Sequence, residues 1–146
     1  ALNPALLPFS WEIIEKMQKK KKPKFASIGD LMKYELVARF GGFAIDTNFE
    51  IQSPARFLQL YSKTRFSLFV GANENNCSLK CAIDGDKYLS NGFFGGITSS
   101  PVLLRATEPK RLQTIDLSNP VVNETTGPFY LRKCVGELKI NLFLVF

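Results

Sequence analysis

Hydrophobic residues near the start of the chain recur at the spacing of α-helices. Ser10 stands before a pattern that predicts a short helix over residues 11–20, in which Trp11, Ile14 and Met17 would lie on one face. Serine is a favourable N-cap because its hydroxyl accepts a hydrogen bond from a free backbone amide. We therefore expect a short amphipathic helix ahead of the main part of the domain.

A longer pattern predicts a second helix. It would begin with Ser27 as its N-cap and end at Gly41-Gly42, since glycine commonly follows the last helical residue. Glu35 and Arg39 lie four residues apart and are expected to pair on the polar side. The predicted apolar face consists of Ile28, Leu31, Met32, Leu36, Val37 and Phe40.

The rest of the chain alternates helix-like and strand-like segments. Helices are expected over residues 54–61 and from Pro101 and Pro128, because proline is favoured in the first helical turn. Strands are predicted at 43–45, 66–70, 93–94 and 139–146, with a polar loop at 71–76 and a turn at 84–86. This alternation indicates an α/β fold, and the length indicates a single domain over residues 1–146.

Composition excludes several chemistries. The chain has 146 residues, of which 45% are hydrophobic and 22% charged, as is typical of a globular domain. It contains no histidine, which excludes a Ser-His-Asp triad, a Cys-His dyad and a histidine metal site. Cys77, Cys81 and Cys134 form no complete zinc ligand set. Their odd number favours a reducing, cytoplasmic compartment, while a Golgi-type lumen stays open if an anchor lies outside this chain.

The net charge of +6 is concentrated in six lysines between Lys16 and Lys24. This run is either a solvated helix end and loop or a surface for phosphate, nucleic acid or an anionic membrane. Few aromatic residues interleave with the lysines, so base stacking is unsupported and no nucleic-acid partner is expected. No stretch reaches the roughly 18 apolar residues that span a bilayer, so no transmembrane segment is expected here.

One segment combines a helix, a glycine turn and acidic residues. Asp46 directly follows a short apolar strand, and we expect it in a cleft at the C-terminal end of a central strand, where α/β sheets bind ligands. If the extended backbone continued, Asp46, Asn48 and Glu50 would share one face. Such oxygens suit Mg²⁺ or Mn²⁺, which would neutralise a diphosphate leaving group. Taken singly, each residue favours a purely structural role, Asp46 as a turn residue or a helix cap and Asp30 as a helical partner of Lys33.

This segment resembles the sugar-binding DXD region of a glycosyltransferase family. The family includes the initiating α-mannosyltransferases and the glucosylating domains of the large clostridial toxins. The resemblance rests on Asp30 and Lys33 on a helix, then Gly41-Gly42, a hydrophobic strand and Asp46-Thr47-Asn48. Segments 91–101 and 126–128 are similar to two later blocks of the family, so the likeness covers residues 25 to about 135 in order.

The resemblance implies a GT-A fold, with a mixed sheet flanked by helices, a nucleotide-sugar donor, a glycan or protein acceptor and retention of anomeric configuration. It implies that Asp46 and Asp30 are catalytic and that Asp30, Lys33, Asp46 and Asn91 bind the donor sugar and nucleotide. The implied cofactor is a divalent cation, Mn²⁺ or Mg²⁺, on Asp46 and Asn48. Thr126 is expected only to cap the last helix.

Several positions depart from the family pattern. Asn48 replaces a carboxylate, Lys33 replaces the usual arginine, and Ala44 stands where an aromatic residue often lies near the nucleotide. The family's usual first strand is not found, so we expect either a portion of a longer protein or a reduced relative. These departures favour an alternative function, a non-catalytic GT-A-like structural or binding module.

Overall fold

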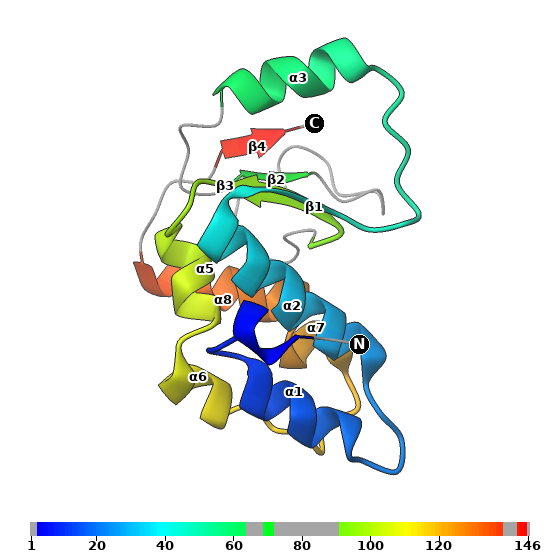
Figure 1. The fold of residues 1–146 in the computed structure, drawn as a ribbon, viewed down its shortest axis with the longest axis vertical. Helices are drawn as coiled ribbons and strands as arrows, with labels where there is room; N and C mark the ends of the chain where they lie inside the picture. The colour runs from blue at the N-terminus through cyan, green and yellow to red at the C-terminus, as the bar shows by residue number, and fades with distance from the viewer. Residues whose placement is uncertain (1–2, 64–68, 72–90, 139–142, 146) are drawn as a thin grey trace.

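A computed structural model describes residues 3–63, 69–71, 91–138 and 143–145. The chain folds into a group of helices on one side of a small sheet, with one further helix on the other side (Figure 1). The first part runs η1 (Pro4–Leu6), α1 (Trp11–Gln18), α2 (Phe25–Phe40), β1 (Gly42–Ile45) and α3 (Pro54–Lys63). The second part runs β2 (Phe69–Gly71), β3 (Phe93–Gly96), α5 (Pro101–Ala106), α6 (Pro109–Gln113), α7 (Val122–Thr125), α8 (Pro128–Leu138) and β4 (Phe143–Val145).

The four strands form one mixed sheet in the order β1-β3-β2-β4. β3 pairs antiparallel with both β1 and β2, whereas β2 and β4 run parallel. The expected α/β class is therefore confirmed, and so are the strand at 43–45 and the helices opened by Pro54, Pro101 and Pro128. The expectation of a central strand before Asp46 is wrong, because β1 lies at the edge of the sheet.

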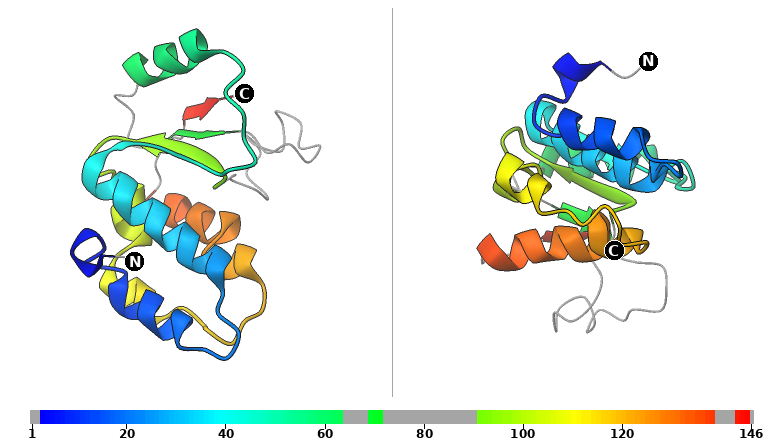
Figure 2. Two further views of the ribbon diagram at one scale, coloured as in Figure 1. Left: turned by 45° about the vertical axis from the view of Figure 1, so that its right-hand side comes forward. Right: turned by 90° about the horizontal axis from the view of Figure 1, so that it is seen from below.

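The two faces of the sheet have different partners. Ala44 and Phe94 are paired across β1 and β3 and are buried against the helices, where the Phe94 ring lies 5.5 Å from that of Tyr34 on α2. Side chains alternate along a strand, so Phe43 and Phe93 lie on the opposite face. There Phe57 of α3 packs against Phe43, with ring centroids 4.8 Å apart. Figure 2 shows α3 across the sheet from α2.

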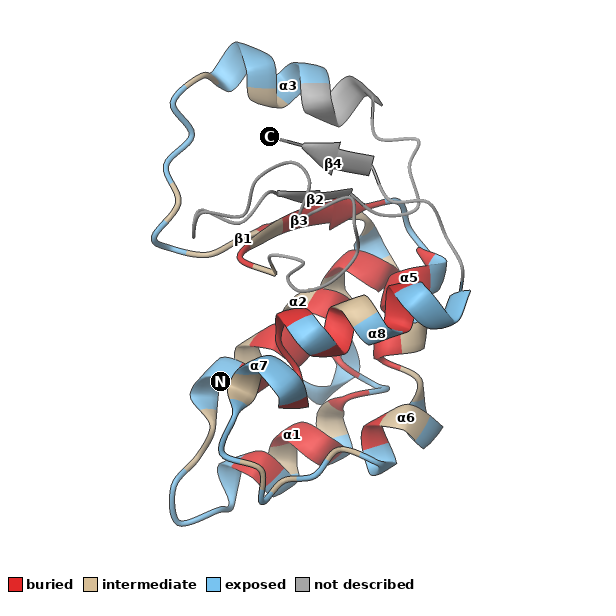
Figure 3. Cartoon of the chain, turned by 180° about the vertical axis from the view of Figure 1, so that it is seen from behind, coloured by how far each residue is buried: buried red, intermediate tan, exposed pale blue. Residues whose placement is uncertain are grey.

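Helix α2 is the centre of the core. It starts at Phe25, where the amide of Ile28 donates to the carbonyl of Lys24 at 3.0 Å. The expected N-cap, Ser27, is therefore wrong, since Ser27 lies inside the helix and is buried. Of the predicted apolar face, Phe40 is 60% exposed, and the other five residues are buried or partly buried (Figure 3).

The polar side of α2 holds the N-terminal segment instead of forming the predicted Glu35–Arg39 pair. The buried Glu35 carboxylate accepts hydrogen bonds from the amides of Phe9 and Ser10, both at 2.8 Å, and from the Ser10 hydroxyl. Arg39 donates to the carbonyls of residues 5–6 at 3.0 and 2.6 Å. The Ser10 hydroxyl is thereby engaged, so it does not cap α1 as expected.

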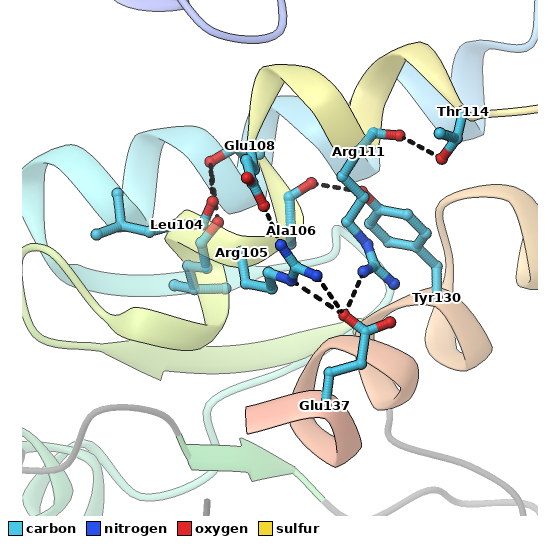
Figure 4. A network of polar contacts seen from close by, with 10 residues as sticks. Leu104, Arg105, Ala106, Glu108, Arg111, Thr114, Tyr130 and Glu137 are labelled. Atoms are coloured by element: carbon cyan, nitrogen blue, oxygen red, sulfur yellow. Dashed lines mark hydrogen bonds and ion pairs between the residues drawn. The ribbon is translucent and has the colours of Figure 1, made fainter. Parts of the chain in front are cut away.

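The helices behind α2 are joined by an ion-pair network (Figure 4). The Glu137 carboxylate of α8 lies 2.9 Å from Arg105 of α5 and 2.6 Å from Arg111 of α6. The Tyr130 hydroxyl of α8 donates to the carbonyl of Ala106. These contacts hold α5, α6 and α8 together beside the sheet.

Some predicted features lie outside the described residues. They include the first part of the 66–70 strand, the 72–76 loop, the 84–86 turn, and Cys77 and Cys81. Cys134 is described; it is buried and forms no disulfide. No helix in the described ranges is long and apolar enough to cross a membrane.

Candidate functional site

Four residues singled out from the sequence meet at one place, and we call Asp30, Lys33, Asp46 and Asn91 the polar cluster. The Lys33 ammonium lies 2.7 Å from Asp46 Oδ1 and 3.5 Å from Asp30 Oδ1. It also donates to the carbonyl of Asn91 at 3.0 Å. The Asn91 side-chain amide in turn donates to Asp30 Oδ1 at 2.7 Å. The cluster thus joins residues up to 61 positions apart.

The backbone explains why these residues converge. Asp30 and Lys33 are one helical turn apart on α2, so they face the same way. Gly41 and Gly42 have φ values of 70° and 95°, a left-handed conformation that reverses the chain after α2 and leads into β1. Pairing of β1 with β3 continues to Asp46, whose amide donates to the carbonyl of Gly92 at 2.7 Å. Asn91 is thereby placed beside Asp46.

Asp30 is the buried member of the cluster. Its Oδ2 accepts a hydrogen bond from the Thr126 hydroxyl at 3.1 Å, while Oδ1 faces Lys33 and Asn91. Burial raises the pKa of the Asp30 carboxyl, and the charge of Lys33 and the Thr126 hydrogen bond oppose that rise only in part. The expectation that Thr126 caps the last helix is wrong: Thr126 ends α7, α8 begins at Pro128, and the Thr126 hydroxyl binds Asp30 instead.

Tyr34 is a residue of the site that the sequence did not reveal. Its buried hydroxyl donates to the carbonyl of Thr126 at 2.8 Å and accepts from the Asn91 amide at 3.2 Å. Burial, with the nearby Asp30 charge, raises the pKa of Tyr34 well above its ordinary value, so the phenol keeps its proton. Tyr34 follows Lys33 directly, but its partners lie 57 and 92 residues away, which no local pattern indicates.

Asp46 is the accessible member of the cluster, with its side chain 43% exposed. Gly92 makes room for it. A Cβ at position 92 would lie 3.2 Å from Asp46 Oδ2 and 2.8 Å from the ring of Phe49. Only glycine leaves both groups in place, so Gly92 also shapes the site, a role that the sequence analysis did not predict.

The predicted alternation of Asp46, Asn48 and Glu50 along an extended strand is wrong. The strand ends at Ile45, and Asp46 opens a turn in which its carbonyl accepts from the amide of Phe49 at 3.0 Å. Aspartate and asparagine favour turns because their short side chains bond to nearby backbone, and here that preference overrides strand continuation. Asn48 lies exposed in this turn and Glu50 lies exposed after it.

Few side chains at this site could bind the divalent cation that the family resemblance implies. Within the described ranges, no three acidic or cysteine side chains gather closely enough to hold a metal ion. Asp46 and Asn48 are two residues apart in one accessible turn and supply a carboxylate and an amide oxygen, which are hard ligands. These oxygens have the chemistry that Mg²⁺ or Mn²⁺ prefers, but the Asp46 carboxylate is paired with Lys33 in this structure.

Another hollow, of about 310 Å³, lies between α6, α7 and α8, away from the polar cluster. Three of its four charged side chains already have partners. Arg111 is held by Glu137, the Asp116 carboxylate accepts from the amide and hydroxyl of Ser118, and Glu124 accepts from the side chain of Asn119. This hollow therefore offers a ligand few free charges.

Comparisons with known proteins add no assignment. Neither a scan of protein-family models nor searches of curated proteins and of solved structures found a match for this chain. The likeness to the DXD glycosyltransferases thus rests on the motif residues. What the structure adds is that four of those residues lie within hydrogen-bonding or ion-pairing distance of one another.

Proposed function

We propose that this chain is a glycosyltransferase domain that binds a nucleotide sugar at the polar cluster. The observation that carries the proposal is the convergence of Asp30, Lys33, Asp46 and Asn91 beside an accessible turn. Sugar hydroxyls both donate and accept hydrogen bonds. The cluster offers carboxylate acceptors together with ammonium and amide donors, which matches that requirement.

The proposed roles follow from burial. Asp46 is accessible and would accept a hydrogen bond from a hydroxyl of the donor sugar or ribose. Asp30 is buried and would accept a hydrogen bond from the sugar through Oδ1, the oxygen that lies beside Lys33 and Asn91. Lys33 would hold both carboxylates in position and offset the negative charge of the donor phosphates.

The proposed reaction transfers the sugar to a glycan or protein hydroxyl. The acceptor oxygen forms a bond to the anomeric carbon as the bond from that carbon to the diphosphate oxygen breaks. The electron pair leaves with the nucleoside diphosphate, which also takes the hydroxyl proton. Attack from the side of the leaving group gives retention. When bound, a divalent cation on Asp46 and Asn48 would stabilise the charge developing on the diphosphate.

The architecture supports a GT-A-like arrangement at a coarse level. The sheet is mixed, helices cover both of its faces, and the acidic turn follows β1 immediately. We therefore propose a GT-A-like fold for this chain.

A second candidate function is a non-catalytic module that keeps the same binding surface. The specific observation in its favour is that the Asp46 carboxylate is already neutralised by Lys33, while the neighbouring Asn48 is neutral. Such a site carries little net negative charge for a cation. A binding module would bind sugar or nucleotide without breaking the glycosyl bond.

Donor hydrolysis separates the two functions. We expect the chain with Mn²⁺ to hydrolyse at least one member of a nucleotide-sugar panel. Asp46→Ala should lower that rate on the order of 10²-fold, about 3 kcal/mol of transition-state stabilisation. Asn48→Asp should tighten Mn²⁺ binding, because an anionic ligand replaces a neutral one. Glu12→Ala, on the exposed side of α1, is the matched control and should leave the rate unchanged.

Two results would contradict the proposal. If Asp46→Ala hydrolyses the donor at the parent rate, this turn is not the catalytic site. Donor binding without hydrolysis by the parent and by Asn48→Asp would establish the non-catalytic module instead.

A further inference from the structure

An apolar hollow of about 250 Å³ lies between α3 and the sheet, next to the turn that follows β1. Its lining includes Ile45 and Phe49, the residues that bracket the Asp46 turn. The ring of Phe49 and the carboxylate of Asp46 both lie against Gly92. A Cβ atom added to this glycine would be 2.8 Å from the Phe49 ring and 3.2 Å from Asp46 Oδ2. Phe49 therefore borders the hollow and also lies close to the Asp46 carboxylate.

Aromatic rings from three segments form the floor of this hollow. Phe93 of β3 lies 6.2 Å from Phe49 of the turn and 6.4 Å from Phe57 of α3, measured between ring centroids. Phe57 is also fixed by its packing on Phe43, at 4.8 Å. Ile51, which is 45% exposed, continues the apolar wall. Rings held by neighbouring rings form a rigid surface that is present before any ligand binds.

The polar groups of the hollow stand at its rim. Glu50, Gln52 and Arg56 line it and are exposed, and the partly exposed Ser53 is its fourth polar residue. A ligand inside would therefore meet apolar surface on its inner side and polar groups only where it emerges. This is the usual anatomy of a pocket for an apolar group carried by a polar molecule.

We propose that the hollow binds an aromatic or alkyl aglycone of the acceptor, so that the preferred acceptor is a glycoside with an apolar group. This inference rests on the proposed transferase function. An apolar cavity of about 150 Å³ accommodates benzene, so about 250 Å³ is enough for a ring or a short alkyl chain. An acceptor sugar attached to that group would lie at the rim next to Asp46, where its hydroxyl meets the donor.

A nucleobase is the competing occupant, and the lining disfavours it. A base carries donors and acceptors along its edge, and burying them without partners costs free energy. The apolar lining consists of Ile45, Phe49, Ile51, Phe57 and Phe93, and the hydroxyl of Ser53, which also lines the hollow, already accepts from the amide of Arg56. An apolar aglycone leaves no such group unpaired.

The test compares methyl and hexyl glycosides of the same sugar, below the micelle concentration. Their binding to the chain is measured by calorimetry without donor, and their use as acceptors is measured with donor. We expect the hexyl glycoside to bind at least tenfold more tightly than the methyl glycoside. Phe57→Ala and Ile51→Gln should abolish that preference, and the exposed position of Ile51 keeps the second variant free of core damage. Gln18→Ala, at an exposed position of α1 outside the hollow, is the control and should retain it.

Equal binding of the two glycosides would overturn the inference, as would a preference that survives both wall variants. Competition by a nucleoside monophosphate for the hexyl site would assign the hollow to the donor base and overturn it too. Donor hydrolysis reports separately on the proposed function. Hydrolysis without a chain-length preference contradicts only the aglycone site, whereas hexyl binding without hydrolysis of any donor contradicts the transferase reaction.

Discussion

The Lys33 ammonium on α2 lies 2.7 Å from the Asp46 carboxylate at the end of β1 and 3.5 Å from Asp30. One cation thus bridges a buried and an accessible carboxylate. Without it, two negative charges would face each other across the start of the sheet. The same contact ties the central helix to the strand that follows it, so it serves the fold and the proposed site together.

Lys33→Gln should destabilise the chain. It removes the counter-charge of Asp30 and leaves two carboxylates close together, and we expect a loss of about 1–3 kcal/mol in the free energy of unfolding. Urea denaturation at neutral pH measures it. Lys16→Gln is the control, because the Lys16–Glu12 pair is exposed and such pairs contribute little. Equal stability of the two variants would show that the bridge is unimportant.

The stability of the chain should depend on the ionisation of Asp30. The pKa of Asp30 is raised above 3.8, chiefly by burial, so the folded chain holds this proton to higher pH than the unfolded chain does. Its contribution to stability is therefore present below pH 3.8 and declines as the pH rises through the folded-state pKa. We expect Asp30→Asn to remove this decline, so that its stability relative to the parent increases with pH across that window. A constant difference at all pH values would contradict this.

Glu35→Ala should release the N-terminal segment. It leaves two backbone amides and the Ser10 hydroxyl without their acceptor, and we expect a loss of about 3 kcal/mol or more in the free energy of unfolding. Glu35→Gln retains one acceptor oxygen and should lose less. Chemical denaturation provides the measurement, with the exposed Glu15→Ala on α1 as control. Limited proteolysis before residue 11 should accelerate in Glu35→Ala alone.

Cys134 should be unreactive in the folded chain. Burial raises the pKa of its thiol to about 11, so at pH 8 about one molecule in a thousand carries the reactive thiolate. We expect iodoacetamide at pH 8 to leave the Cys134 peptide unmodified until denaturant is added, as measured by peptide mass spectrometry. Full alkylation under native conditions would show that this helix opens readily.

Local signals in the sequence identified much of the fold. Gly41-Gly42, Pro101 and Pro128 predicted element boundaries correctly, because left-handed glycine and first-turn proline act through the adjacent backbone. The predictions that failed depended on distant partners. Glu35 pairs with a segment 25 residues away rather than with Arg39 one turn along the helix, and no periodicity reveals that.

The candidate site was also predicted only in part, because some of its contacts are between residues far apart in the sequence. Its motif residues were visible as a pattern, and the β1–β3 pairing brought Asn91 to Asp46. Thr126 and Tyr34 were missed as site residues because their contacts span 57 to 96 positions. The extended arrangement of Asn48 was wrong because a turn ends β1 at Ile45.

The most direct test of the donor site is amide NMR of the ¹⁵N-labelled chain during titration with UDP-glucose and GDP-mannose, with Mn²⁺ replaced by diamagnetic Mg²⁺. If the polar cluster binds the donor, the largest shift changes should occur at Asp30, Lys33, Asp46 and Asn91, and Asp46→Ala should abolish them. Changes confined to the lysine-rich segment 16–24, or no saturable change with any nucleotide sugar, would contradict a donor site at this cluster.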